Sequence, residues 1–355
     1  MSPIPDWFRR LPILGVGLAV LLTASPPVAA QEVTLRLHQF LPAQANVPEL
    51  ILDVWADRIE DASDDRIAIE RYPSMQLGGA PPELMDQAID GVADIVMTVV
   101  GYTPGRFPTT EVFELPFFVT DARAASAAFW SLYEEEMQAE FADVHVLGTW
   151  VHGPGLFHSV DPIESLDDLR GVKVRGPSRM VNAMLDVLGA EPVGMPVPAV
   201  PEALSKGVID GAMLPWEVVP SLRVHELVEF HTGFDGPALY TLTFVLVMNR
   251  EAYASLPDDL RTVVDDNSGL AFSVFAGGTQ ADADAPARDL AVDLGNEIIT
   301  IPADRADEWR AAVQPVYDSW IADMDAAGRD GAGILARAQA LMDGFDPSAD
   351  TYGDR

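Results

Sequence analysis

A short segment in the middle of the chain combines basic residues with a strand-like pattern. The segment Gly171–Pro177 contains Lys173, one of only two lysines in 355 residues, and it places Arg175 at the end of a short predicted strand. Ligands of open α/β sheets bind beyond the carboxyl ends of the strands. A guanidinium there presents a planar fork of donors that matches a carboxylate. Arg175 is therefore a candidate for binding an organic acid; the alternative is an ion pair with one of the many acidic residues.

A second segment, His225–His231, nearly matches a zinc-binding helix motif. That motif needs two imidazoles one helical turn apart, and the corresponding second position is Glu229. The two histidines are six residues apart, which places them on different faces of a helix. We therefore expect an exposed helix end before a strand that begins at Thr241, and no metal ion or other cofactor.

Motifs for covalent and nucleotide chemistry are missing from the sequence. Gly-x-Ser-x-Gly and the Walker phosphate loop are absent, and no Gly-x-Gly-x-x-Gly follows a predicted strand. The absence of cysteine excludes disulfides, thiol nucleophiles and a lipid-anchored N-terminus. The acidic residues are too numerous for any two to stand out as an acid–base pair. We therefore expect a protein that is not an enzyme.

The charge of the chain limits its partners. The 55 acidic residues against 22 basic ones give a net charge of −33, which opposes binding to nucleic acid or to an anionic membrane. A hydrophobic content of 48% fits a folded protein of one large or two smaller domains. Twenty of the basic residues are arginines, which fits either a GC-rich genome or adaptation to high salt, and both explanations stay open.

The N-terminus has the pattern of a secretory signal peptide. Arg9 and Arg10 precede the apolar run Leu11–Leu22, and Pro26–Ala30 ends in small residues. The run is short for a membrane span, although an uncleaved anchor is the alternative. We predict cleavage after Ala30 or within two residues of it, and a periplasmic, acidic mature protein that does not insert into the membrane.

The first third of the chain alternates strands and helices. The apolar patterns predict strands at 33–37, 67–72 and 95–100 and helices at 47–62 and 83–89. Such alternation is typical of a doubly wound α/β unit with a parallel sheet.

The same alternation returns after a helix predicted near 122–141. Strands are expected at 145–150, 172–175, 209–214 and 241–248, with helices at 179–188 and 199–206. A long helix at 304–327 contains Pro315, which should kink it. Because no polar linker separates the two units, we expect two interleaved lobes.

Several motifs along the chain resemble those of the extracytoplasmic solute-binding subunits of TRAP transporters (DctP type). The resemblance runs in order from about residue 33 to 345. It is carried by Tyr72–Gly79, Glu83-Leu84, Gly91–Ile95, Glu114–Phe118, Leu166–Arg175, Leu188–Val193, Gly207–Gly211, Leu256–Leu260, Trp320 and Gly328–Gly331.

The resemblance implies a two-lobed periplasmic binding protein, type II-like, that closes on an organic acid and delivers it to TRAP membrane subunits. Arg175 occupies the position of the family's carboxylate-binding arginine. The expected lobes are 31–152 with 242–281, and 153–241 with 282–345, which includes the long C-terminal helix; 346–355 would form a tail.

The sequence departs from the family at three polar positions. A second arginine found in sialic-acid-type relatives is missing from Gly153–Phe157, an asparagine is replaced by Leu214, and a glutamate by Val99. Burying ligand hydroxyl groups against such residues would cost on the order of 1–3 kcal/mol each. We therefore expect a small, rather apolar monocarboxylate, either aromatic or a 2-oxo acid.

Further ligand contacts are expected near the ends of predicted strands. Trp216 is placed to stack on a flat ligand, and the candidates for polar contacts are Tyr102, His152, Ser178 and Tyr240. Glu217 is the position where some relatives hold a bridging metal ion. The alternative functions are a ligand-binding sensor or chemoreceptor partner and, less favoured, a secreted enzyme on the same scaffold.

Overall fold

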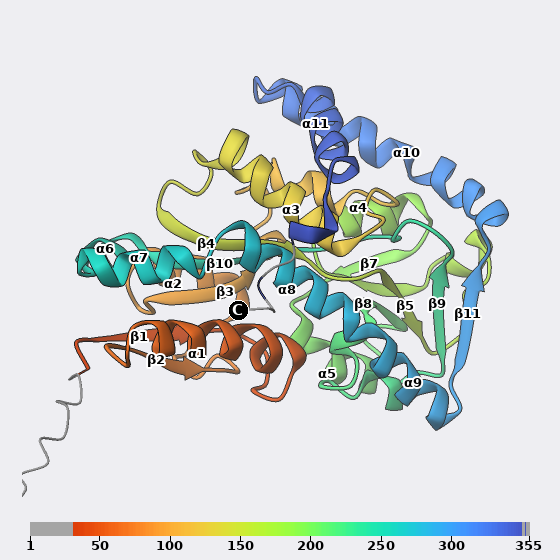
Figure 1. Ribbon diagram of the computed structural model, residues 1–355. Helices are drawn as coiled ribbons and strands as arrows, with labels where there is room; N and C mark the ends of the chain where they lie inside the picture. The colour runs from red at the N-terminus through yellow and green to blue at the C-terminus, as the bar shows by residue number, and fades with distance from the viewer. Residues whose placement is uncertain (1–30, 350–351, 353–355) are drawn as a thin grey trace, which may run out of the picture.

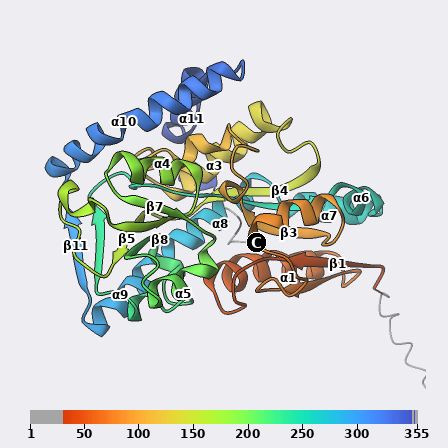
Figure 2. The same cartoon turned by 180° about the vertical axis from the view of Figure 1, so that it is seen from behind.

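The chain forms two lobes, each built around one β-sheet (Figures 1 and 2). The structure, a computed structural model, describes residues 31–349 and residue 352. The predicted signal peptide and five of the ten residues of the predicted tail lie outside the described residues, so those two predictions are not addressed.

The first sheet has the strand order β2-β1-β3-β10-β4. Its strands are β1 (Val33–His38), β2 (Ile67–Tyr72), β3 (Ile95–Val99), β4 (Val144–Val151) and β10 (Thr243–Asn249). Strand β1 is parallel to β2 and β3, whereas β10 is antiparallel to β3 and β4. The expectation of a parallel sheet is therefore wrong for β10, which comes from a much later part of the chain.

The second sheet has the strand order β11-β9-β5-β8-β6-β7. Its strands are β5 (Gly155–Ser159), β6 (Lys173–Gly176), β7 (Glu191–Gly194), β8 (Gly211–Pro215), β9 (Phe230–Phe234) and β11 (Glu297–Ile301). Strand β6 is parallel to β7 and β8, and β5 is antiparallel to β8 and β9. The carboxyl ends of β6 and β8 therefore lie at the same edge.

The segment His225–His231 differs from its prediction. A short 3-10 turn (Val224–Glu226) leads into β9, and His231 is buried in that strand rather than exposed on a helix end. Its Nδ1 lies 2.7 Å from Nδ1 of His158 on the neighbouring β5. The imidazoles of His158 and His231 therefore pack against each other between β5 and β9.

The chain passes between the lobes more than once. It leaves the first sheet after β4, returns to it with β10, and leaves again after helix α8 (Leu270–Asp282). The prediction of two interleaved lobes is therefore confirmed. His152, Tyr240 and Gln280 all lie at or next to these passages, so the crossing segments place side chains between the sheets.

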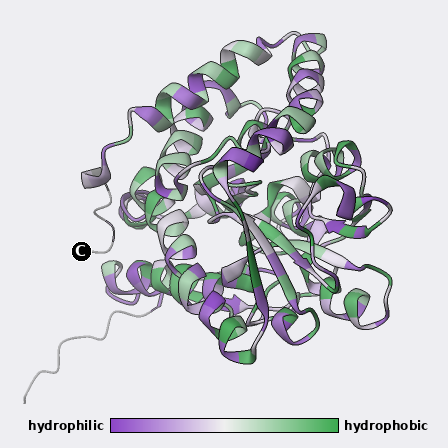
Figure 3. Ribbon diagram, turned by 90° about the vertical axis from the view of Figure 1, so that its right-hand side faces the viewer, coloured by the Kyte–Doolittle hydropathy of each residue, from purple (hydrophilic) through white to green (hydrophobic). Residues whose placement is uncertain are grey.

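Helices surround the two sheets. Besides α8, the α-helices of the described residues are α1 (Asp53–Ala62), α2 (Leu84–Ile89), α3 (Ala122–Leu132), α4 (Arg179–Val187), α5 (Val200–Ser205), α6 (Arg250–Ser255), α7 (Asp258–Asp266), α9 (Asp284–Leu294), α10 (Ala303–Ala326) and α11 (Gly331–Asp343). Polar and apolar residues alternate along the long C-terminal helices (Figure 3).

The two C-terminal helices connect the lobes. Helix α10, which contains Pro315, packs against α4, and α11 packs against α3 of the first lobe (Figure 1). Tyr317 and Trp320 donate hydrogen bonds to the carbonyl groups of Pro116 and Pro108, at 2.8 and 3.1 Å. Part of the segment 282–345, assigned by sequence to the second lobe, thus contacts the first.

Helix α8 is held close to the first sheet by glycines. A Cβ atom at Gly148 of β4 would lie 2.4 Å from the ring of Phe272, and one at Gly277 would lie 2.1 Å from Oγ of Ser126 on α3. This close packing fixes α8, and with it the side chain of Gln280 near its end.

Candidate ligand-binding site

Arg175 is buried in the second lobe. It lies on β6 between β7 and β8 with 1% of its surface exposed. Its Nε donates to the carbonyl of Met195 at 2.9 Å and its Nη1 to the carbonyl of Met213 at 2.8 Å. Its Nη2 has no hydrogen-bond partner among the described residues. Two backbone carbonyls therefore orient the guanidinium and leave one edge of its fork unused.

The alternative role for Arg175, an ion pair within the protein, is not seen. In the part of the chain that the structure describes, no carboxylate oxygen lies within 4.0 Å of its nitrogens. A buried, unpaired cation is costly, and an anionic ligand would remove that cost.

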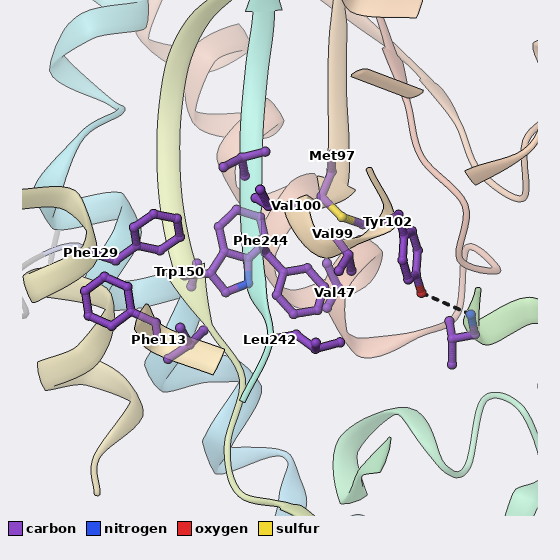
Figure 4. Packing of buried hydrophobic residues seen from close by; sticks show 14 of the residues in the cluster. Val47, Met97, Val99, Val100, Tyr102, Phe113, Phe129, Trp150, Leu242 and Phe244 are labelled. Atoms are coloured by element: carbon purple, nitrogen blue, oxygen red, sulfur yellow. Dashed lines mark hydrogen bonds between the residues drawn. The ribbon is translucent and has the colours of Figure 1, made fainter. Parts of the chain in front are cut away.

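Two tyrosines lie near this guanidinium. The hydroxyl of Tyr102 accepts a hydrogen bond from the backbone N–H of Val197 at 3.0 Å, which joins the two lobes (Figure 4). The hydroxyl of Tyr240 is buried and has no partner among the described residues. Burial raises the pKa of both tyrosines, while the charge of Arg175 lowers it. Both phenols stay protonated and can donate to an anion.

The position of the Tyr240 ring depends on Gly155 in the neighbouring strand β5. The backbone N–H of Gly155 donates to the carbonyl of Tyr240 at 3.0 Å, and a Cβ atom at Gly155 would lie 2.1 Å from the tyrosine ring. The segment in which sialic-acid-type relatives were expected to carry an arginine thus leaves room for Tyr240.

His152 contributes its ring rather than a polar atom. Its Nδ1 donates to the carbonyl of Gly153 at 2.5 Å, and its Nε2 accepts from the backbone N–H of Leu242 at 3.1 Å. Burial lowers the pKa of His152 to about 4, so the ring is neutral at pH 7. With both nitrogens engaged, the imidazole forms part of the wall.

Ser178 and Trp216 lie elsewhere. The Ser178 hydroxyl accepts a hydrogen bond from the backbone N–H of Val181 and caps helix α4. The Trp216 ring packs against His158 and His231, with ring centroids 5.0 and 4.7 Å apart, beside a hollow on another side of the lobe. The structure therefore does not bring these two residues to the cavity around Arg175.

A cavity between the lobes contains the remaining candidates. The part of it that the centre of a water molecule can reach has a volume of about 30 Å³. Its walls are mainly apolar, and Figure 4 shows Val99, Leu242 and Phe244 side by side, with Tyr102 across from them. The lining residues are Phe40, Leu41, Val99, Tyr102, His152, Arg175, Val197, Leu214, Pro215, Glu217, Val218, Tyr240, Leu242, Phe244 and Gln280.

The two apolar replacements noted in the sequence, Val99 and Leu214, do line this cavity. No pattern in the sequence distinguishes Gln280 or Phe244 as a site residue. Gln280 lies on an apolar helix whose position depends on long-range packing, and no local pattern reports it. The apolar lining residues look like any other buried residues in the sequence.

Two acids, the buried Glu217 and the partly buried Asp284, lie beside the cavity. The backbone N–H of Glu217 donates to Oδ1 of Asp284 at 2.9 Å. Burial raises the pKa of Glu217 to about 7 and that of Asp284 to about 8. Across residues 31–349 and 352, no three His, Asp or Glu side chains are grouped closely enough to hold a metal ion.

The geometry defines a two-lobed protein with a cavity between its lobes, and the comparisons give its family. The sequence model of the bacterial extracellular solute-binding proteins, family 7 (DctP), matches residues 41–323. The chain therefore belongs to this family, as the resemblance implied, and its members are receptors of TRAP transporters rather than enzymes. No helix in the described residues is long and apolar enough to cross a membrane.

Solved structures of TRAP solute-binding proteins are similar to this chain over most of its length. One from Rhodoferax ferrireducens, in complex with copurified benzoate, is 51% identical with a TM-score of 0.86, and the match covers 87% of this chain and 97% of that one. One from a marine metagenome, specific for aromatic acid ligands and crystallised with 3-hydroxybenzoate, is 44% identical with a TM-score of 0.87, covering 89% and 100%.

A curated relative is also similar over its full length. The outer membrane transporter protein TsaT of Comamonas testosteroni is 28% identical over 94% of this chain and 98% of its own.

Proposed function

We propose that this protein binds a small aromatic monocarboxylate of the benzoate type between its lobes and delivers it to the membrane subunits of a TRAP transporter. One observation carries the proposal. The guanidinium of Arg175 is buried in an apolar cavity without a carboxylate partner, and the unpartnered hydroxyl of Tyr240 is near it.

The cavity favours one carboxylate over two. Arg175 is the only cation among its lining residues, so a second ligand carboxylate would be buried without a positive partner. The apolar side chains offer dispersion contacts to a flat ring and no partners to a polyhydroxylated sugar acid. Of the acid classes expected from the sequence, the aromatic one also agrees with the ligands of the Rhodoferax and marine relatives.

The place of action follows from the family. Its members are extracellular solute-binding proteins, and the N-terminal pattern of this chain fits export to the periplasm with cleavage near Ala30. The loaded, closed protein would dock on the membrane subunits, which release the acid and move it inward. The high negative charge keeps the free protein soluble.

Isothermal titration calorimetry of the purified exported protein with benzoate tests the proposal. The wild type should bind benzoate, and Arg175→Met should lose at least about 100-fold in affinity, because hydrogen bonds to a charged group are worth about 1.5–3 kcal/mol each. Arg170→Met is the matched control, since Arg170 is exposed and pairs with Asp167.

The control should bind benzoate like the wild type. Unchanged affinity in Arg175→Met would refute the clamp, and no binding of benzoate or its analogues by the wild type would refute the aromatic class.

A further inference from the structure

The carboxyl group of Glu217 is held in a fixed orientation at the cavity. Glu217 follows β8 in a short 3-10 turn (Trp216–Val218) and is 3% exposed. Nε2 of Gln280 donates to its Oε1 at 2.8 Å, and Oε1 of Gln280 accepts from the indole N–H of Trp150 at 2.9 Å. Because the indole can only donate, it fixes which end of the Gln280 amide faces Glu217.

Glu217 lies toward the outside of the cavity, away from Arg175. It lines both the cavity and an outer groove formed with Asn46 and Ser221, whereas Arg175 lines only the cavity. The charge of Arg175 lowers the pKa of Tyr102, Tyr240 and His152, whereas burial is the main cause of the raised pKa of Glu217, whose carboxyl accepts from Gln280 and whose backbone carbonyl accepts from Asn46. Arg175 and Glu217 thus lie in different parts of the cavity lining.

Glu217 is the acidic group at this end and has capacity for further hydrogen bonds. A carboxylate accepts up to about four hydrogen bonds, and Gln280 supplies one to Oε1. The amide of Gln280 keeps one N–H beyond its bonds to Glu217 and Trp150, whereas both nitrogens of His152 are engaged. The rest of the wall, including Leu41 and Val218, is apolar.

A hydroxyl group is the ligand feature that fits this position. It donates to Glu217 when the carboxyl is ionised and accepts from it when the carboxyl is protonated, so it is compatible with a buried acid in either state. A second anionic group on the ligand would be repelled by the ionised form, and an aliphatic substituent would leave the buried carboxyl without a partner.

We infer that Glu217 determines specificity by binding a hydroxyl group on the ring of the ligand, so that the preferred ligands are hydroxylated aromatic monocarboxylates. This inference rests on the proposed function. Arg175 and Tyr240 would hold the carboxylate, and Glu217, positioned by Gln280, would bind the hydroxyl at the other end. The 3-hydroxybenzoate bound to the marine relative belongs to this ligand class.

Calorimetric titration with benzoate and with pairs of hydroxyl- and methyl-substituted benzoates tests the inference. Hydroxyl and methyl groups are similar in size, so 3-hydroxybenzoate against 3-methylbenzoate, and the 4-substituted pair, isolate the hydrogen bond. In the wild type, one of the two pairs should favour the hydroxyl by about tenfold or more, as expected for a hydrogen bond to a charged or acidic group.

Two variants separate recognition from packing. Glu217→Met keeps the side-chain length and should reduce the preference for the hydroxyl over the methyl ligand to about one or below. Glu217→Gln should retain the preference, because an amide still bonds a hydroxyl. Glu202→Met is the control, since Glu202 lies exposed on α5.

The outcomes distinguish the two proposals. If the wild type binds the hydroxyl and methyl ligands with nearly equal affinity at both ring positions, the role of Glu217 is overturned even if neither variant folds. A preference for the hydroxyl ligand that survives in Glu217→Met overturns it as well. Failure of benzoate and of every analogue to bind the wild type instead refutes the aromatic acid as ligand, and this inference falls with it.

Discussion

Single buried polar groups carry most of the functional information in this protein. Arg175 was singled out from sequence because a lysine-poor chain places an arginine at the end of a short strand. Its burial and the carbonyls of Met195 and Met213 that orient it follow from pairing across three strands, which no local pattern shows. Trp216 shows the opposite case, because its place in the sequence suggested a ligand contact and its ring packs on histidines instead.

The hydroxyl of Tyr240 provides a prediction at the scale of one atom. Because that hydroxyl is buried without a protein partner, Tyr240→Phe should leave the free energy of unfolding of the free protein unchanged or higher. Ligand affinity should fall by about tenfold, since the ligand loses one donor. Calorimetry with benzoate and urea unfolding measure the two effects.

Tyr317→Phe is the matched control for this change. Its hydroxyl donates to the carbonyl of Pro116 far along the chain, so its loss should reduce the stability by about 1 kcal/mol without affecting the affinity. If Tyr240→Phe behaved like Tyr317→Phe, the hydroxyl of Tyr240 would have no role in binding.

Secondary structure elements were predictable where their own residues show the apolar periodicity of a strand or a helix. The strand at 67–72 agrees with β2, and α4 and α10 begin and end within a residue of their expected bounds, because each buries one face of a strongly patterned segment. Strands β5, β7, β9 and β11 were missed, since they are four or five residues long, and β5, β7 and β9 also contain glycine, proline or histidine. Their pairing depends on partners far along the chain.

Strand β5 provides a prediction at the scale of an element. Gly155→Ala should displace the ring of Tyr240, because the new Cβ would lie 2.1 Å from it. We expect a loss of about 1–3 kcal/mol in stability from overpacking and a clear loss of benzoate affinity. Urea unfolding and calorimetry measure both.

Gly233→Ala on the adjacent strand β9 is the control. A Cβ there would meet Leu156 at 3.8 Å, an ordinary contact, so stability and affinity should change little. Wild-type affinity in Gly155→Ala would show that the close approach of β5 does not position Tyr240 for the ligand.

At the scale of the whole molecule, an anion must approach a strongly anionic protein. The net charge of −33 repels the ligand at long range, whereas Arg175 attracts it only within the cavity. Salt at 0.1 M screens interactions beyond about 10 Å and leaves buried contacts largely intact. The association rate constant for benzoate should therefore rise with ionic strength.

Stopped-flow measurements of intrinsic tryptophan fluorescence between 10 and 500 mM NaCl test this. Sodium sulfate at matched ionic strength controls for specific chloride effects. Faster association or tighter binding at the lowest salt would mean that local positive charge, and not the overall field, governs the approach.

Buried acids near the interface of the lobes link stability to pH. Burial raises the pKa of Glu114 and Glu217 to about 7 and that of Asp284 to about 8. In the unfolded chain these groups titrate near 4.5 and 3.8. Between those limits these three acids bind more protons in the native state than in the unfolded state, so their contribution to the free energy of unfolding falls as pH rises, by up to about 1.4 kcal/mol per pH unit for each extra proton.

Asp284→Asn tests this link because its amide oxygen can still accept the backbone N–H of Glu217. Below about pH 6.5 the buried His152, His158 and His231 oppose this slope, because burial lowers their pKa and they charge only in the unfolded chain. Urea unfolding between pH 7.5 and 9 should therefore show wild-type stability falling with pH, and a shallower fall in the variant, which should be the more stable protein above pH 8. Asp258→Asn, with a side chain 99% exposed, should parallel the wild type. A wild-type stability that rises from pH 7.5 to 8.5 would contradict the raised pKa of these acids.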